Sequence, residues 1–160
     1  RKQPDPRGSF ELFGFDVMIS KTGEIHVLEV NVSPALGTSS NLDMFIKAPL
    51  VKDLFNIALV PHPSDACNKI EKLATKRKDD KACAAIAICE YEEALKRGGG
   101  FHCIYPTKER VESFRKYIER FEPEDEALAK WISLPEGEEK KEYLSGLLGH
   151  LNECIKKNSE

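Results

Sequence analysis

Two apolar runs on either side of a short turn constrain the fold of this chain more than any other feature. Residues 10–19 (FELFGFDVMI) and residues 25–32 (IHVLEVNV) flank a five-residue segment that contains Gly23. This pattern is typical of a β-hairpin. Both runs are apolar on both faces, as in strands that are covered on each side. Because two strands are not stable alone, we expect the rest of the sheet outside this chain, or in parts of it that cannot be recognised as strands.

The remainder of the chain is predicted to be mainly helical, so the expected fold class is α+β. Ser40 or Asn41 can cap a helix that Pro49 either kinks or restarts. A polar stretch over residues 61–81, with a basic cluster at 76–78, is interpreted as a linker. Further helices are predicted over residues 82–97, ending at three glycines, over 107–120, from 122 through Trp131, and over 144–155.

Composition excludes several classes of protein. Lys and Arg total 24 against 27 Asp and Glu, a net charge of −3, which argues against non-specific nucleic-acid binding. The longest apolar run covers residues 82–89, far short of the roughly 18 residues that a bilayer span needs, so no membrane contact is expected. Five cysteines without a C-x-x-C pair favour a reducing compartment, with the cytosol as the default. No Cys-His pairing with metal-ligand spacing is predicted.

Three oxygen-bearing side chains stand out in the apolar hairpin. Asp16 lies on one face of the first strand, and Glu29 and Asn31 share a face of the second with residues 25 and 27. A two-residue turn would place Asp16 opposite Glu29, a four-residue loop would place it diagonally, and either puts all three side chains on one side. Two carboxylates and an amide oxygen suit Mg²⁺ better than zinc. The alternative is that they are ordinary polar residues on a solvated strand face.

Longer motifs around these residues point to a family. FELFGFDVM at 10–18 and LEVNVSP at 28–34 are followed by NLDMFIK at 41–47 and LVKDLFN at 50–56, with a weaker block over 92–107. Together they resemble the C-terminal end of the ATP-grasp catalytic domain of tubulin tyrosine ligase-like enzymes. The resemblance implies that residues 1–60 are the C-terminal part of that ligase domain, residues 61–81 a linker, and residues 82–160 a helical C-terminal extension.

The resemblance also implies an activity. Such enzymes use ATP and Mg²⁺ to ligate an amino acid, most often glutamate, onto a carboxylate of the acidic tubulin tail, through an acyl phosphate. Asp16, Glu29 and Asn31 correspond to the Mg²⁺ ligands. Lys47 corresponds to a lysine that the family carries after its Leu-Asp helix start, and we expect it to contact an anionic substrate group, with a solvated helix lysine as the alternative. Tubulin and microtubules are the implied partners, and the implied location is cytoplasmic and cytoskeletal, including the cilium or basal body.

Several alternatives stay open at the level of sequence. The lysines and Gly-rich loop with which ATP-grasp domains hold ATP lie upstream of this hairpin in the family, so the isolated chain is expected to be inactive. The metal ligands do not encode the donor amino acid, so a tyrosine or glycine ligase is also compatible. Val32, at a position where chain-extending members tend to carry His, resembles members that start branches. A non-catalytic module, with residues 82–160 as a partner-binding surface, is the remaining alternative.

Overall fold

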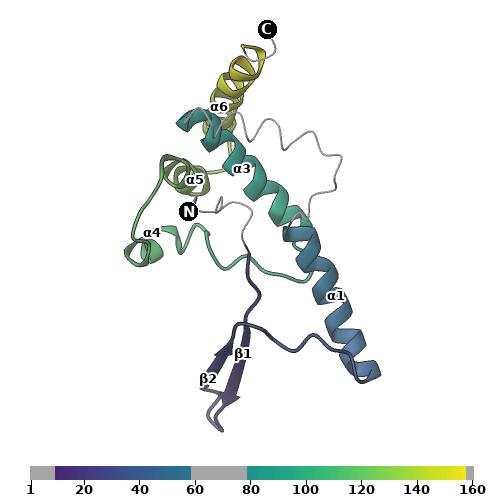
Figure 1. The fold of residues 1–160 in the computed structure, drawn as a ribbon. Coiled ribbons are helices and arrows are strands. Elements are labelled where there is room, and N and C mark those ends of the chain that lie inside the picture. Colours follow the sequence, from purple (N-terminus) through teal and green to yellow (C-terminus); the bar gives the residue numbers. More distant parts are fainter. Residues whose placement is uncertain (1–9, 59–78, 158–160) are drawn as a thin grey trace, which may run out of the picture. The chain divides into compact units, whose positions relative to one another are not determined.

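The chain divides into two compact units, Arg1–Ala58 and Leu59–Glu160. The computed structural model describes residues 10–58 and 79–157 (Figure 1). The described part of the first unit is a β-hairpin followed by one long helix, and that of the second is helical. This agrees with the predicted α+β fold class. The predicted linker lies outside the described residues, except for positions 79–81 at the start of a helix.

The predicted hairpin is confirmed as two antiparallel strands, β1 (Gly14–Ile19) and β2 (Ile25–Asn31). Its loop is neither of the two lengths expected, because Ile19 pairs with Ile25 and five residues lie between them. The backbone N–H of Ser20 donates to the Glu24 carbonyl at 2.9 Å, and the Ser20 hydroxyl accepts from the Glu24 N–H at 3.0 Å. Gly23 has a φ of +86°, which a residue without a Cβ adopts at little cost.

A β-bulge changes the strand register that the five-residue loop sets. Val17 pairs with Val27, but the next residue of β1, Asp16, pairs with Glu29, which leaves Leu28 as the extra residue on β2. Side chains alternate along β1, so the Val17 pair and the Asp16 pair lie on opposite faces. The expectation that Glu29 shares a face with Val27 is therefore wrong, although Glu29 does lie opposite Asp16.

Helix α1 (Asn41–Ala58) begins as predicted and continues through Pro49, so of the two alternatives considered there, a restart of the helix is wrong. Its start is a reciprocal cap in which the Ser40 hydroxyl accepts from the Asp43 N–H at 3.1 Å, and an Asp43 carboxylate oxygen accepts from the Ser40 N–H at 3.1 Å. Proline has no backbone N–H and so removes one hydrogen-bond donor, yet the helix continues to Ala58.

The second unit contains α3 (Asp80–Arg97), the short α4 (Val111–Phe114), the 3₁₀ turn η2 (Arg115–Tyr117), α5 (Pro123–Ser133) and α6 (Glu138–Lys156). Helices α3 and α5 match the predictions, and α6 includes the predicted segment 144–155 but begins at Glu138. The helix predicted to reach Arg120 is wrong, because the backbone becomes extended at Ile118. Arg115 there forms an ion pair with Glu126 and lies 4.4 Å from the Phe121 ring centre, which ties the segment to α5.

The core of this unit lies where α3, α5 and α6 meet. Ile88 of α3 is fully buried and packs with Trp131 and Ile132 of α5, and α6 contributes Tyr143, Leu144 and Leu147. The Trp131 indole N–H donates to a carboxylate oxygen of Glu92 at 2.7 Å, so its polar edge is satisfied. Within the described ranges, none of the helices combines the length and apolarity needed to cross a bilayer.

Candidate functional site

The three predicted ligands meet on one face of the hairpin. Asp16 and Glu29 are directly opposite each other, and Asn31 is opposite Gly14, two positions along on each strand. Cross-strand partners have Cβ atoms about 4.5–5.5 Å apart, which is within reach of a shared ion. Both carboxylates are exposed and Asn31 is half-buried. The Asn31 amide nitrogen donates to a Glu29 carboxylate oxygen at 3.2 Å, so these side chains already point toward each other.

The electrostatics of this face favour a cation. Within residues 10–58 and 79–157, no Lys or Arg forms an ion pair with Asp16 or Glu29. Two like charges directly opposite each other in a hairpin are destabilising. A divalent ion would remove that repulsion, and two carboxylates with an amide oxygen are the hard donors that Mg²⁺ accepts. Binding of Mg²⁺ by these three residues stays a prediction.

Gly14 keeps one end of this face accessible to the chain that follows β2. A Cβ at position 14 would lie 2.9 Å from the Pro34 Cβ and 3.8 Å from the Asn31 Cβ. Gly14 and Asp16 are two residues apart on β1, so a Cβ at Gly14 would point to the face that carries the three ligands. Pro34 therefore packs across Gly14 at the edge of the candidate site, and only glycine leaves room for that approach.

Lys47 has structural partners in addition to its predicted role with substrate. Its ammonium group lies 2.9 Å from an Asp43 carboxylate oxygen and donates to the Gly37 carbonyl at 2.7 Å. The hydrogen bond to Gly37 connects α1 to the loop after β2. The hydrogen bond from Lys47, followed by those from Ser40 and Ser39, holds the pKa of Asp43 well below its ordinary value of 3.8. An ammonium group has three N–H donors, so contact with a substrate anion stays a prediction that these bonds do not preclude.

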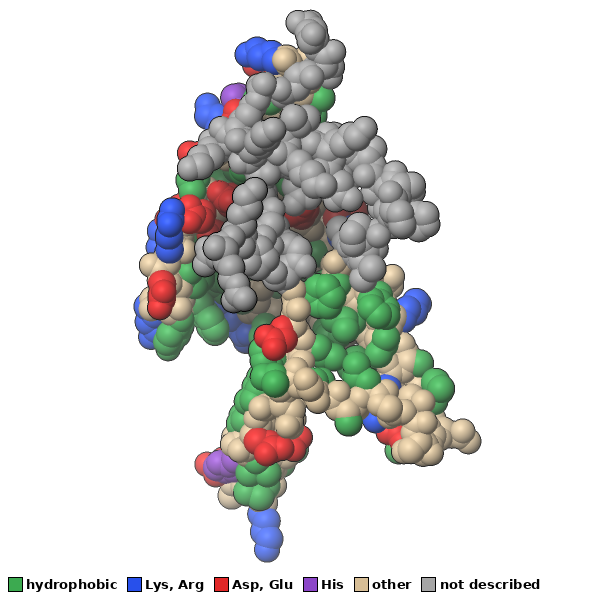
Figure 2. All heavy atoms as spheres, viewed as in Figure 1, with side chains coloured by type: hydrophobic (Ala, Val, Ile, Leu, Met, Phe, Trp, Pro, Cys, Tyr) green, Lys and Arg blue, Asp and Glu red, His purple; other side chains and the backbone are tan. Residues whose placement is uncertain are grey.

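Apolar side chains cover much of the rest of the first unit, and they are exposed. Ile19 and Ile25 are 67% and 70% exposed, and Phe45 of α1 is 77% exposed. Figure 2 shows such side chains at the surface of the hairpin. None of the described residues of this unit is buried. An exposed apolar surface of this extent is typical of an interaction surface.

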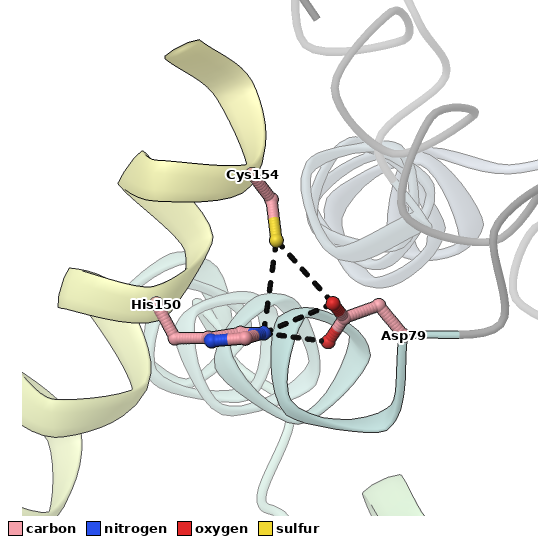
Figure 3. A group of neighbouring side chains, drawn as sticks. All are labelled: Asp79, His150 and Cys154. Atoms are coloured by element: carbon pink, nitrogen blue, oxygen red, sulfur yellow. Dashed lines mark hydrogen bonds and ion pairs between the residues drawn. The ribbon is translucent and has the colours of Figure 1, made fainter. Parts of the chain in front are cut away.

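A second cluster of possible ligands lies in the helical unit, and the sequence pattern does not predict it. Asp79, just before α3, lies against His150 and Cys154 of α6 (Figure 3). The expectation that the chain has no Cys-His pairing with metal-ligand spacing is therefore wrong. The available signal was the four-residue spacing of His150 and Cys154, which places both on one face of a helix. Asp79 is 71 residues from His150 in sequence, so only the folded helices bring it there.

The hydrogen bonds of Asp79 explain its charge state. One carboxylate oxygen accepts from the Ala82 backbone N–H at 3.0 Å and so caps α3. The carboxylate also contacts the His150 Nε2 and the Cys154 thiol. The Ala82 bond first, and then that of His150, lower the pKa of Asp79 to about 2. Asp79 is therefore a carboxylate at neutral pH.

Comparisons with known proteins bear on the first unit most directly. Residues 1–67 match the model of the tubulin-tyrosine ligase family. The human tubulin monoglutamylase TTLL4 is 45% identical over 62 residues, which are 38% of this chain and 5% of the relative. The Caenorhabditis elegans tubulin polyglutamylase ttll-4 is 28% identical over 68% of this chain and 24% of the relative. The mouse tubulin polyglutamylase TTLL5 is 25% identical over 89% of this chain and 14% of the relative.

The matched length is a small part of each relative, from 5% to 24% in these three proteins. No solved structure matches the chain. The family match includes the hairpin with Asp16, Glu29 and Asn31 and the whole of α1. Residues 1–67 are therefore similar to the tubulin-tyrosine ligase family, the resemblance that the hairpin sequence predicts.

Proposed function

We propose that this chain supplies the metal-binding hairpin of an ATP-dependent ligase that adds glutamate to carboxylates of tubulin tails. Asp16, Glu29 and Asn31 are the proposed Mg²⁺ ligands. The observation that carries this proposal is the direct pairing of Asp16 with Glu29 on an exposed strand face, with Asn31 hydrogen-bonded to Glu29 beside them. The family match of this segment, and the glutamylase names of the relatives, support glutamate as the donor and tubulin as the acceptor.

In the proposed reaction the acceptor carboxylate takes the γ-phosphoryl group of ATP, which leaves as ADP. The incoming amine then attacks the resulting acyl phosphate and expels inorganic phosphate, which forms the amide bond. Mg²⁺, when bound, neutralises phosphate charge that develops during phosphoryl transfer and orients the phosphates. The role of this chain would be to hold the positive charge of the Mg²⁺ ion in place. Without a cation, the two carboxylates would repel the phosphates of ATP, because like charges a few ångströms apart interact unfavourably.

The exposed apolar surface of the first unit supports a further part of the proposal. Strands that are apolar on both faces belong inside a covered sheet. We therefore place the hairpin within a larger ATP-grasp domain, whose remaining strands and helices cover Ile19, Ile25 and Phe45. In this arrangement ATP contacts other parts of the domain, and this chain alone is inactive.

The test is a glutamylation assay on the full-length gene product that contains this chain. Glu29→Gln removes a proposed ligand charge with almost no change in shape, and Glu24→Gln makes the same change in the hairpin loop, away from the site. We expect Glu29→Gln to lower glutamate incorporation into tubulin at least about 100-fold, because even residues that only support metal ligands cost about 10–100-fold. Glu24→Gln should keep wild-type activity.

Three results would contradict parts of the proposal. Full activity in Glu29→Gln would remove this residue from the metal site. Incorporation of tyrosine or glycine in place of glutamate, with Glu29→Gln inactive, would keep the metal site and reassign the donor. A full-length protein that incorporates none of the three amino acids into tubulin would favour the non-catalytic module.

A further inference from the structure

Three potential metal ligands of different chemistry converge within the helical unit. Asp79 precedes the first residue of α3, and His150 and Cys154 lie one turn apart on α6. Figure 3 shows all three side chains pointing toward one another. We propose that Asp79, His150 and Cys154 bind a zinc ion that links the start of α3 to α6.

The distances between the ligand atoms fit one tetrahedral ion. His150 Nε2 lies 2.9 Å from an Asp79 carboxylate oxygen and 3.6 Å from the Cys154 sulfur, which is 3.3 Å from the same carboxylate. With zinc bonds of about 2.0–2.1 Å to nitrogen and oxygen and 2.3 Å to sulfur, tetrahedral ligand atoms are about 3.3–3.6 Å apart. An ion therefore requires the ligand atoms to separate by only a few tenths of an ångström.

The donor set selects the kind of metal. A thiolate and an imidazole are ligands that zinc binds well, whereas Mg²⁺ and Ca²⁺ require oxygen ligands. Three protein ligands leave one position of the tetrahedron for water. The His150 and Asp79 side chains are 35% and 27% exposed, so an ion can reach them from solvent.

The same geometry argues against a nucleophilic thiol with a histidine base. In such an arrangement one ring nitrogen of the histidine contacts the nucleophile, and the other contacts the carboxylate that orients the ring. Here the single Nε2 atom faces both the Cys154 sulfur and the Asp79 carboxylate. Convergence of three groups on one point is what a metal ion requires.

Two features hold the ligands in position before an ion binds. Asp79 is fixed by its hydrogen bond to the Ala82 N–H, at 3.0 Å from the carboxylate oxygen. Beside it, Ala82 and Cys83 of α3 pack with Leu151 of α6 in a small apolar cluster. The backbone positions of the three ligands are thus set by α3–α6 packing, and ordering them on metal binding costs little conformational entropy.

The experiment uses the full 160-residue chain, reduced and freed of metal, titrated with Co²⁺ alone and then with Zn²⁺. We expect one equivalent of Co²⁺ to give tetrahedral absorption with a thiolate-to-cobalt charge-transfer band, and Zn²⁺ to displace it. Cys154→Ser should abolish the charge-transfer band and weaken Zn²⁺ binding at least about 100-fold, since a direct ligand matters more than the supporting residues that cost 10–100-fold. The control Cys103→Ser changes an exposed thiol outside the cluster and should leave both unchanged.

His150→Gln is the second variant, in case Cys154→Ser does not fold, as judged by circular dichroism. It should keep the helical spectrum and lose tight Zn²⁺ binding. Absence of the charge-transfer band in the folded wild-type chain, or its persistence in Cys154→Ser, would overturn the proposal. The hairpin offers no thiol, so Glu29→Gln should retain the band, which separates this site from the proposed Mg²⁺ site.

Discussion

Replacing Ile88 by Ala tests whether the α3–α5–α6 core stabilises the helical unit. Ile88 is 0% exposed and packs against Trp131 and Ile132. The substitution removes three carbon atoms from full burial, which at about 0.8 kcal/mol for each buried CH₂ gives a loss of about 2.4 kcal/mol. The cavity left among these large side chains adds to that, so we expect a loss of about 3–4 kcal/mol, within the usual range for Ile→Ala in cores.

The assay is urea and thermal unfolding followed by fluorescence. The chain has a single tryptophan, Trp131, and it lies in this core, so its emission reports on the helical unit alone. For a domain of about 100 residues, a loss of 3 kcal/mol lowers the Tm by about 12 °C or more. The matched control is Leu95→Ala on the same helix. Leu95 is 46% exposed, and Ala has the higher helix propensity, so its loss should be under about 1 kcal/mol.

A result in which Ile88→Ala and Leu95→Ala lose the same stability would refute this reasoning. It would mean that the burial of Ile88 among α5 and α6 side chains does not contribute to the unfolding free energy. A large loss from Leu95→Ala alone would instead indicate that the exposed side of α3 packs against something in solution.

Two further predictions concern the first unit. Gly14→Ala should lower the stability of the hairpin by about 1–3 kcal/mol, because the added Cβ would overlap Pro34. Faster amide hydrogen exchange in β1 and β2 would report this loss. The control Gly37→Ala, where a Cβ meets nothing within 4 Å, should be near neutral. Lys47→Met should raise the pKa of Asp43 toward 3.8 in an NMR titration. Because the folded-state pKa of Asp43 is depressed, this carboxylate stabilises the fold above about pH 4, and the contribution is lost as the pH falls below that. In Lys47→Met the contribution should be smaller. An unchanged Asp43 titration in this variant would contradict the ion pair.

Residues that act through local patterns could be predicted from the sequence. The two apolar runs predict the hairpin, and the glycines after Arg97 predict the end of α3, because these signals act over a few residues. The pairing of Asp16 with Glu29 was also one of the expected arrangements. The cause of this pairing differs from the expected one, since a five-residue loop and the bulge at Leu28 together produce the register that a two-residue turn would give.

Other features depend on choices that local patterns leave open. Pro49 is compatible with a kink or with a new helix, and the chain continues as one helix. The helix after Thr107 ends early, where Arg115 contacts Glu126 of α5. Such contacts between separate elements compete with helix propensity, which is worth only a few tenths of a kcal/mol per residue.

The amino-acid sequence by itself determined the hairpin, the positions of the main helices, the similarity of the first 67 residues to the tubulin-tyrosine ligase family and the candidate Mg²⁺ ligands. These follow from side-chain periodicity and from motifs whose members are close together in the chain. Only the tertiary structure decided that Asp79 meets His150 and Cys154, because no local pattern specifies how α3 packs against α6. Burial of Ile88 and its neighbours fixes that packing, and the packing brings ligands from distant parts of the sequence to one point.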